Sequence, residues 1–231
     1  MHRKAESTEV AGIRGSALRG GLADALRERT RSLHRQAESG GIVHDILRGQ
    51  ASRHGYALLL RNLLPAYREM EHGLERLRDA PGVRAVAHPA LYRSRAIESD
   101  LAGLCGQEWH RTLPLLEAGV RYARAVAVAG EGSGLRLIAH AYVRYLGDLN
   151  GGRVVRHHLR RTLGLEACHL AFYDFPAIAD LDRFRSRYRD AFDDASRDLP
   201  EIEPILDEAV TAFRLNMELS DAVQVAAALM P

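Results

Sequence analysis

Apolar side chains recur every three or four positions through residues 52–78, and this spacing constrains the fold more than any other feature of the sequence. A period near 3.6 residues is typical of an amphipathic helix, and the alternation typical of half-buried strands is almost absent from the whole chain. Pro65 lies inside the segment and should kink the helix. The apolar stripe consists of Tyr56, Leu59, Leu60, Leu63, Leu64, Tyr67, Met70, Leu74 and Leu77.

The same period marks further helices, separated by stretches rich in glycine and proline. With 231 residues, 46% of them hydrophobic, the chain is long enough to build one large core. We therefore expect a polar, flexible tail over 1–20 and a single all-α domain over 21–231, a multi-helix bundle packed around shared cavities. The other predicted helices span about 21–38, 42–47, 94–104, 113–128, 181–194 and 205–229.

Composition excludes several classes of protein. Charged residues make up 27% of the chain and nearly cancel to a net +2, which argues against a nucleic-acid-binding field over the whole surface. Cys105 and Cys168 are far apart and form no CxxC motif, which favours a reducing cytoplasm over a disulfide framework or a structural zinc site. No apolar run is long enough to cross a bilayer, and the N-terminus lacks the apolar core of a signal peptide, so we expect no membrane anchor.

The segment "AYVRYLGDLNGGRVV", Ala141 to Val155, combines a helical pattern with three glycines. Each glycine inside a helix costs about 1 kcal/mol relative to alanine, so a compensating role is expected. Gly147 and Gly151 are four residues apart and share a face. They could allow close packing of another helix, or they could let a flat ligand lie against the helix backbone.

His34 lies on the apolar face of the first predicted helix. It could be a hydrogen-bonded core histidine, or a ligand to a metal or to haem iron. Glu38 follows one turn later and could be a second ligand or could orient the imidazole ring. No EXXH pair occurs elsewhere, so a di-iron carboxylate site is poorly supported. A histidine on one helix and a glycine-lined face on another would form the two sides of a haem slot.

The segment "HAYVRYLGDLNGGRVV" strongly resembles the distal-helix motif of haem oxygenases, usually HAYxRYLGDLSGGQ. "LRERTRSLHRQAES" is similar to the proximal helix of that family and places His34 at the position of the iron ligand. "AFYDFP" and "TAFRLNMEL" resemble later segments of the family, and the likeness extends in order over about 22–219. The distal motif is highly specific, whereas composition and periodicity alone do not indicate it.

The resemblance implies an all-helical fold with haem held between a proximal and a distal helix. It implies that haem b serves as both cofactor and substrate, and that dioxygen and electrons from an external donor convert it to biliverdin, carbon monoxide and ferrous iron. A haem carrier or sensor on the same fold is the alternative function. A helical protein that binds no haem is a third reading.

The resemblance also implies roles for single residues. His34 would be the axial metal ligand, with Glu38 holding its ring. Gly147 and Gly151 would crowd the distal face and direct bound dioxygen toward one meso carbon. Asp148 would anchor a water chain, although a carboxylate here could equally be a surface group near a helix kink. Arg144 lies four residues before Asp148, a spacing suited to an ion pair.

Further residues match family positions around the haem. Phe213 would pack against the ring, although an aromatic residue at helical spacing is often plain core. Four arginines, in two pairs with one-turn spacing, would bind the two propionates, and the alternative for them is a solvated charged face. The positions expected to bind the cofactor, besides Glu38, are Arg27, Arg31, Tyr142, Arg185, Arg189, Phe213 and Asn216.

Two departures from the family pattern concern the distal side. Some members carry a tyrosine in the distal water network at the position that we align with Leu64. Leucine cannot donate that hydrogen bond, so the sequence predicts a rearranged network. Asn150 replaces the usual serine of the motif, which is a milder change.

The run "RVVRHHLRR", Arg153 to Arg161, is strongly basic. It could be a solvated helix face. It could also dock an acidic electron donor, such as a ferredoxin, a flavodoxin or another reductase.

Overall fold

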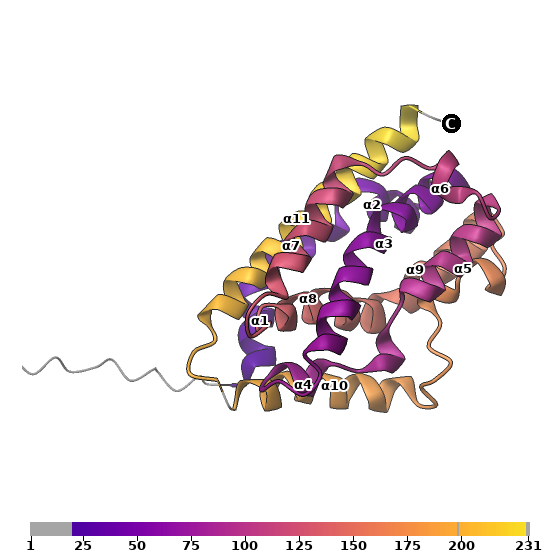
Figure 1. Ribbon diagram of the computed structural model, residues 1–231. Coiled ribbons are helices and arrows are strands. Elements are labelled where there is room, and N and C mark those ends of the chain that lie inside the picture. Colours follow the sequence, from indigo (N-terminus) through magenta and orange to yellow (C-terminus); the bar gives the residue numbers. More distant parts are fainter. Residues whose placement is uncertain (1–19, 198, 230–231) are drawn as a thin grey trace, which may run out of the picture.

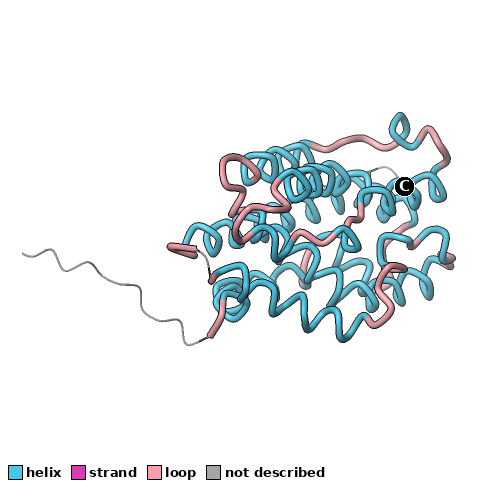
Figure 2. Tube along the Cα trace, turned by 60° about the horizontal axis from the view of Figure 1, so that its bottom comes forward, coloured by secondary structure: helices cyan, strands magenta, loops and turns pink. Residues whose placement is uncertain are grey.

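The computed structural model describes residues 20–197 and 199–229, and throughout this part of the chain the regular structure is helical (Figures 1 and 2). The expected tail over 1–20 lies outside the described residues except for Gly20. In the described part of the chain, no helix combines the length and the apolar character needed to cross a bilayer.

Eleven α-helices and several short helical turns make up the described chain. The N-terminal half contains α1 (Leu22–Glu38), α2 (Gly41–Arg48), α3 (Arg53–Arg76), α4 (Val83–Val86), η1 (Pro89–Leu91), α5 (Ser94–Cys105) and α6 (Trp109–Thr112). The C-terminal half contains α7 (Glu117–Ala129), α8 (Leu137–Ala141), η2 (Tyr142–Leu146), α9 (Gly147–Leu163), η3 (Ala167–His169), η4 (Ala171–Tyr173), α10 (Leu181–Ser196) and α11 (Glu203–Leu229).

The long apolar stripe predicted over 52–78 is helix α3, which runs through the middle of the bundle in contact with α5, α7 and α11 (Figure 1). Ser52 caps its first turn, because the Ser52 hydroxyl accepts the backbone N–H of Gly55 at 3.0 Å. The helix continues through Pro65 without interruption. Its burial on several sides makes it the scaffold on which the other helices are placed.

One predicted boundary is wrong. The sequence pattern predicted a helix from residue 113, but α7 begins only at Glu117, and Leu113 and Leu116 have extended backbones. Pro114 disfavours a helical conformation in the residue before it, which explains the late start. The buried Asn62 side chain holds this extended segment, donating to the carbonyls of Leu58 and Pro114 and accepting the N–H of Leu116 at 2.7 Å.

Helix α1 is fixed between α10 and α11. The Asp193 carboxylate of α10 accepts the backbone N–H of Ala23 at 2.9 Å, and a Cβ on Gly21 would collide with that carboxylate at 2.1 Å. On the other side, Arg29 forms ion pairs with Glu203 and Asp207 of α11. These contacts at its N-terminal half set the direction in which α1 carries His34.

Replacing Asn62 with leucine should destabilise the fold by about 2 kcal/mol, because the N–H of Leu116 loses its acceptor and the carbonyl of Pro114 loses a donor. Chemical denaturation of the unliganded protein measures this loss. Asn62→Asp keeps the acceptor for Leu116 and serves as the comparison. Equal stability of Asn62→Leu and the wild type would show that this amide does not hold the segment.

Candidate active site

A π-helical turn, Tyr142–Leu146, joins α8 to α9 in the middle of what the sequence presents as one helix. The helical pattern of the sequence does not indicate this π-turn. Such turns are rare, add a residue to the local repeat and often occur at functional sites. This one comes directly before Gly147 and contains Arg144, so it sets the orientation of the segment that carries the expected distal residues.

Gly147 and Gly151 lie on an exposed, open face of α9. A Cβ added to either glycine would meet no atom within 4 Å, whereas a Cβ on Gly152 would lie 3.0 Å from Cδ1 of Tyr173. Close helix packing is therefore the wrong explanation for Gly147 and Gly151, whereas Gly152 packs closely against the Tyr173 side chain of η4. The first two glycines leave a bare strip of backbone against which a planar molecule can lie.

His34 is not a core histidine, because 59% of its side chain is exposed. Its ring lies 6.0 Å from that of Phe213, measured between centroids, and its Nδ1 atom is 3.5 Å from a carboxylate oxygen of Glu38. The Glu38 contact can orient the imidazole and leaves Nε2 free to bind a metal. In the described residues, no group of three or more His, Cys, Asp or Glu side chains could hold a metal ion.

A small apolar cluster, separate from the main core, joins α1, the π-turn and α11. Val143 and Phe213 are its large buried members, and Leu33, Ala37 and Tyr142 pack against it. This cluster brings the helix that carries His34 against the segment that leads to Gly147. It places apolar side chains beside His34, and such side chains line most small-molecule sites.

Asp148 is buried and hydrogen-bonded at both carboxylate oxygens. Tyr67 of α3 donates its hydroxyl to Oδ2 at 2.5 Å, and Arg144 donates to Oδ1 at 3.3 Å. Arg144 also donates to the Tyr67 hydroxyl at 2.9 Å and to the Asn216 side-chain oxygen at 2.6 Å. The alternative of a surface carboxylate is therefore wrong, and the expected ion pair between Arg144 and Asp148 is confirmed.

Burial and charge act in opposite directions on this network. Burial raises the pKa of Asp148, while the Arg144 guanidinium and the Tyr67 hydrogen bond lower it. Burial would lower the pKa of Arg144, but its contacts with Tyr67 and Asp148 raise it above the ordinary value. Burial outweighs these two contacts, so the pKa of Asp148 is raised overall, as is common for groups that handle protons in active sites.

The network contains a tyrosine donor, but at a different position from Leu64. Leu64 is fully buried, and the tyrosine hydroxyl comes from Tyr67, three residues further along α3. Tyr67 was not predicted as a site residue, because in the sequence it falls within the apolar stripe of residues 52–78. Tyr122 of α7 was also missed: it is buried, its hydroxyl has no hydrogen-bond partner, and Arg144 and Asp148 both influence its pKa, which burial raises to about 12.

The four expected propionate ligands do not share one environment. Arg189 of α10 forms an ion pair with Asp24 of α1 at 2.6 Å. The positive charges of Arg189 and Arg27 both lower the pKa of the Tyr142 hydroxyl, so these residues lie close together where α10 meets α1. The other two expected ligands, on the same two helices, are paired with acids of their own helix. Arg31 pairs with Glu28, and Arg185 pairs with Asp182.

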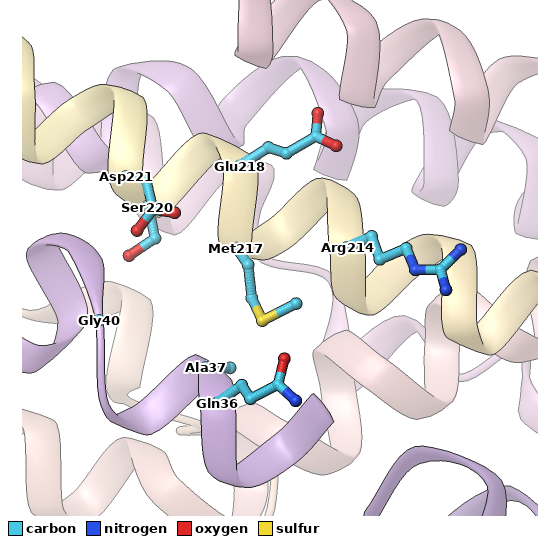
Figure 3. Close-up of a pocket in the computed structure, with 8 residues that line it drawn as sticks. All are labelled: Gln36, Ala37, Gly40, Arg214, Met217, Glu218, Ser220 and Asp221. Carbon is cyan, nitrogen blue, oxygen red and sulfur yellow. The ribbon is translucent and has the colours of Figure 1, made fainter. Parts of the chain in front are cut away.

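A cleft of about 370 Å³ lies between the second half of α1 and α11 (Figure 3). Ala37, which borders this cleft, also packs on the cluster around Phe213, so the cleft adjoins the His34 side of the site. Met217 extends from α11 across it toward Gln36 and Ala37 (Figure 3). No pattern in the sequence predicts this cleft.

The family model described as "Heme oxygenase" matches residues 20–222. Human heme oxygenase 1 is 34% identical over 206 residues, which cover 88% of this chain and 72% of that protein. Heme oxygenase 1 of the cyanobacterium Synechocystis is 34% identical over 203 residues, which cover 88% of this chain and 85% of that protein. Most of the described chain is thus matched in sequence by members of one family.

Solved structures show the same similarity. The crystal structure of Synechocystis heme oxygenase-1 in complex with heme has a TM-score of 0.85 at 32% identity, covering 91% of this chain and 95% of that one. The heme oxygenase of Leptospira interrogans has a TM-score of 0.81 at 32% identity, covering 88% of this chain and all of that one. The predicted all-α fold is confirmed.

The open strip can be tested by comparing neighbouring glycines. Gly151→Ala should stabilise the unliganded protein by about 1 kcal/mol, since alanine favours a helix and the new Cβ meets nothing. Gly152→Ala should destabilise it, because Tyr173 must move.

Gly151→Leu should still fold but bind haem about tenfold or more weakly. Thermal melts and haem titrations measure both effects, and haem binding by Gly151→Leu at wild-type affinity would contradict the open strip as the binding face.

Proposed function

The chain belongs to the haem oxygenase family and is a haem-degrading oxygenase, and we propose that it opens the haem ring between α1 and the segment from Tyr142 to Gly151. The products of that reaction are biliverdin, carbon monoxide and ferrous iron. The observation that carries the proposed site is the buried network of Asp148, Tyr67 and Arg144 beside a strip of helix that bears no side chains.

His34 is the proposed iron ligand. Its exposed imidazole reaches out from α1, and the Glu38 carboxylate near Nδ1 favours the tautomer that carries its proton on this nitrogen and a lone pair on Nε2. Phe213 and the apolar cluster around it limit how far the bound molecule can slide past His34. The chain thereby fixes one face of the substrate through a single side chain.

Haem, once bound, supplies both the iron that activates dioxygen and the porphyrin carbon that is oxidised. The chain supplies a distal face without acid or base side chains in direct reach, because Gly147 and Gly151 have none and the Asn150 side chain is exposed. A bare face leaves room for a small molecule and directs it by backbone contact alone.

Asp148 is the proposed proton-handling group. A carboxylate offers about four lone-pair sites, and Tyr67 and Arg144 occupy one on each oxygen, so sites remain for an ordered water. Because Asp148 follows Gly147 directly, such a water can reach the open strip. Asp148 can accept a proton from this water and return it, while Arg144 and Tyr67 hold the carboxylate in place.

Arginine side chains at the meeting of α1 and α10 are the proposed ligands of the two propionates. Arg189 and Arg27 lie near Tyr142, and Arg31 and Arg185 extend the same helices by one turn. Guanidinium groups bind carboxylates through paired hydrogen bonds. Binding requires Arg189 to exchange Asp24 for a propionate, a substitution of one carboxylate for another.

A non-catalytic haem carrier or sensor would also need His34 and the open strip. It would not need a buried carboxylate held by two donors, which is costly to build unless it is used. The network therefore favours turnover over storage.

Replacing Asp148 with alanine should lower the initial rate of biliverdin formation by about a hundredfold, since general acid–base groups contribute on this scale. Haem affinity should change little, because Asp148 is placed beside the open face and not among the haem ligands. Absorption spectra during aerobic reduction measure the rate, and Asn150→Ala, an exposed neighbour, is the control. Unchanged biliverdin formation by Asp148→Ala would contradict the assigned role.

We also propose that the basic surface formed by Arg153, Arg156, His157, Arg160 and Arg161 docks an acidic electron donor of the ferredoxin, flavodoxin or reductase kind. These side chains surround a hollow of about 460 Å³ on α9, the helix that begins at Gly147. Their ion pairs with acids are long, 4.0 Å for Arg153 with Asp182 and 3.9 Å for Arg156 with Asp174. Positive charge is therefore available on the outer face of the helix that forms the site.

A cytoplasmic setting is consistent with such donors. Both cysteines of the chain, Cys105 and Cys168, are free thiols. Free thiols persist in reducing compartments, where ferredoxins and flavodoxins also operate.

Reversing the charge at Arg160 should reduce the rate of reduction by an acidic donor severalfold at low salt, and added salt should diminish the difference. Stopped-flow reduction of the haem complex at several ionic strengths measures this effect. Arg124→Glu, an exposed arginine on α7, is the matched control and should leave the rate unchanged. Identical rates and salt dependence for Arg160→Glu and the wild type would exclude this surface as the docking site.

A further inference from the structure

Asp100 of α5 is a fully buried carboxylate that the proposed mechanism does not use. Its two oxygens accept the backbone N–H groups of Ala171 at 2.7 Å and Phe172 at 2.8 Å. These are the first two residues of the short turn η4. The Asp100 side chain thus accepts both backbone N–H groups at the start of this turn, which is too short to satisfy them within a helix of its own.

The two aromatic residues of η4 contact the two sides of the proposed site. Phe172 places its ring edge-on against Tyr67, with centroids 5.5 Å apart and an interplanar angle of 87°. Tyr173 lies directly over Gly152 of α9, where even one added carbon would be 3.0 Å from its ring. Tyr67 donates to Asp148, and α9 carries Asp148 near its start. A displacement of η4 would therefore reach both partners of that hydrogen bond.

The environment of Asp100 suits a carboxylate that is held in one place. Burial raises its pKa to about 6, while the two backbone hydrogen bonds and Arg156 of α9 lower it. Arg156 also faces Asp174, the residue that follows η4. Burying a carboxylate lowers the stability of the fold unless hydrogen bonds compensate for the lost water. Here the two hydrogen bonds hold η4 in place between α5 and α9.

We propose that Asp100 is a positioning residue for haem oxidation, which fixes η4 and thereby holds the Tyr67 hydroxyl on the Asp148 carboxylate. The inference rests on the proposed function, because it takes the Asp148 network to control protons beside bound haem. Asp100 is not among the residues proposed to contact haem. It acts through Phe172 and Tyr67.

The test uses the variant Asp100→Asn, which keeps the size of the side chain but turns an N–H₂ group toward one of the two backbone donors. Hydrogen exchange in the unliganded protein should show faster exchange of the Ala171 and Phe172 amides. In the ferric haem complex, the absorption change between its acidic and alkaline forms should move by about 0.5 pH unit, since a hydrogen bond to a charged group is weakened but not removed. Asp180→Asn, at the N-cap of α10, is the control and should not move it.

Tyr67→Phe separates this inference from the proposed function. It should shift the same transition in the same direction and further than Asp100→Asn does. In a Tyr67→Phe background, Asp100→Asn should add no further shift, because the residue through which it acts is already changed. Phe172→Leu, which leaves the Asp100 hydrogen bonds intact, should reproduce the shift and provides the test if Asp100→Asn does not fold.

The outcomes are distinct. If Tyr67→Phe leaves the transition unchanged, the proposed role of the Asp148 network fails. If Tyr67→Phe shifts it but Asp100→Asn only lowers thermal stability, Asp100 is structural and the inference is overturned. An additive shift in the double variant also overturns it, because Asp100 would then act by a route that does not include Tyr67.

Discussion

The buried Asp148 carboxylate is the constraint on which the rest of this site depends. A charge in a dry environment needs partners, and this one receives them from two different parts of the chain. Arg144 comes from the π-turn one turn earlier, and Tyr67 comes from the central helix α3. Asn216 of α11 then binds Arg144. Helices α3, α9 and α11 are thereby joined at a single carboxylate, and the helix that bears Gly147 cannot move without breaking these bonds.

Gly147 and Gly151 of the same segment leave one face of the helix open, at a cost in helix stability. Two glycines on a helix cost about 2 kcal/mol together, and a π-turn beside them gives poorer hydrogen-bond geometry than a regular helix. These glycines give the helix a face without side chains, directly next to the Asp148 carboxylate and its two hydrogen-bond partners. The glycines lower the stability of this part of the helix, and the hydrogen bonds of Asp148 hold it in position.

Sequence reasoning predicted the helices well, because apolar residues at helical spacing must be buried on one side. It also predicted the pair of Arg144 and Asp148, since residues four apart meet on a helix. It missed Tyr67 because a tyrosine in an apolar stripe looks like core until its hydroxyl has a partner, and that partner is 81 residues away. The π-turn and the contacts of Asp100 could not be predicted from the sequence either, since both depend on contacts between distant segments. The late start of α7 could have been foreseen from Pro114.

The most direct test of this account is a crystal structure of the protein with ferric haem. The account predicts haem between α1 and the segment from Tyr142 to Gly151, with His34 Nε2 bound to iron and an ordered water on Asp148 at the opposite face. Iron bound by a residue other than His34, or haem seated away from Gly147 and Gly151, would contradict it.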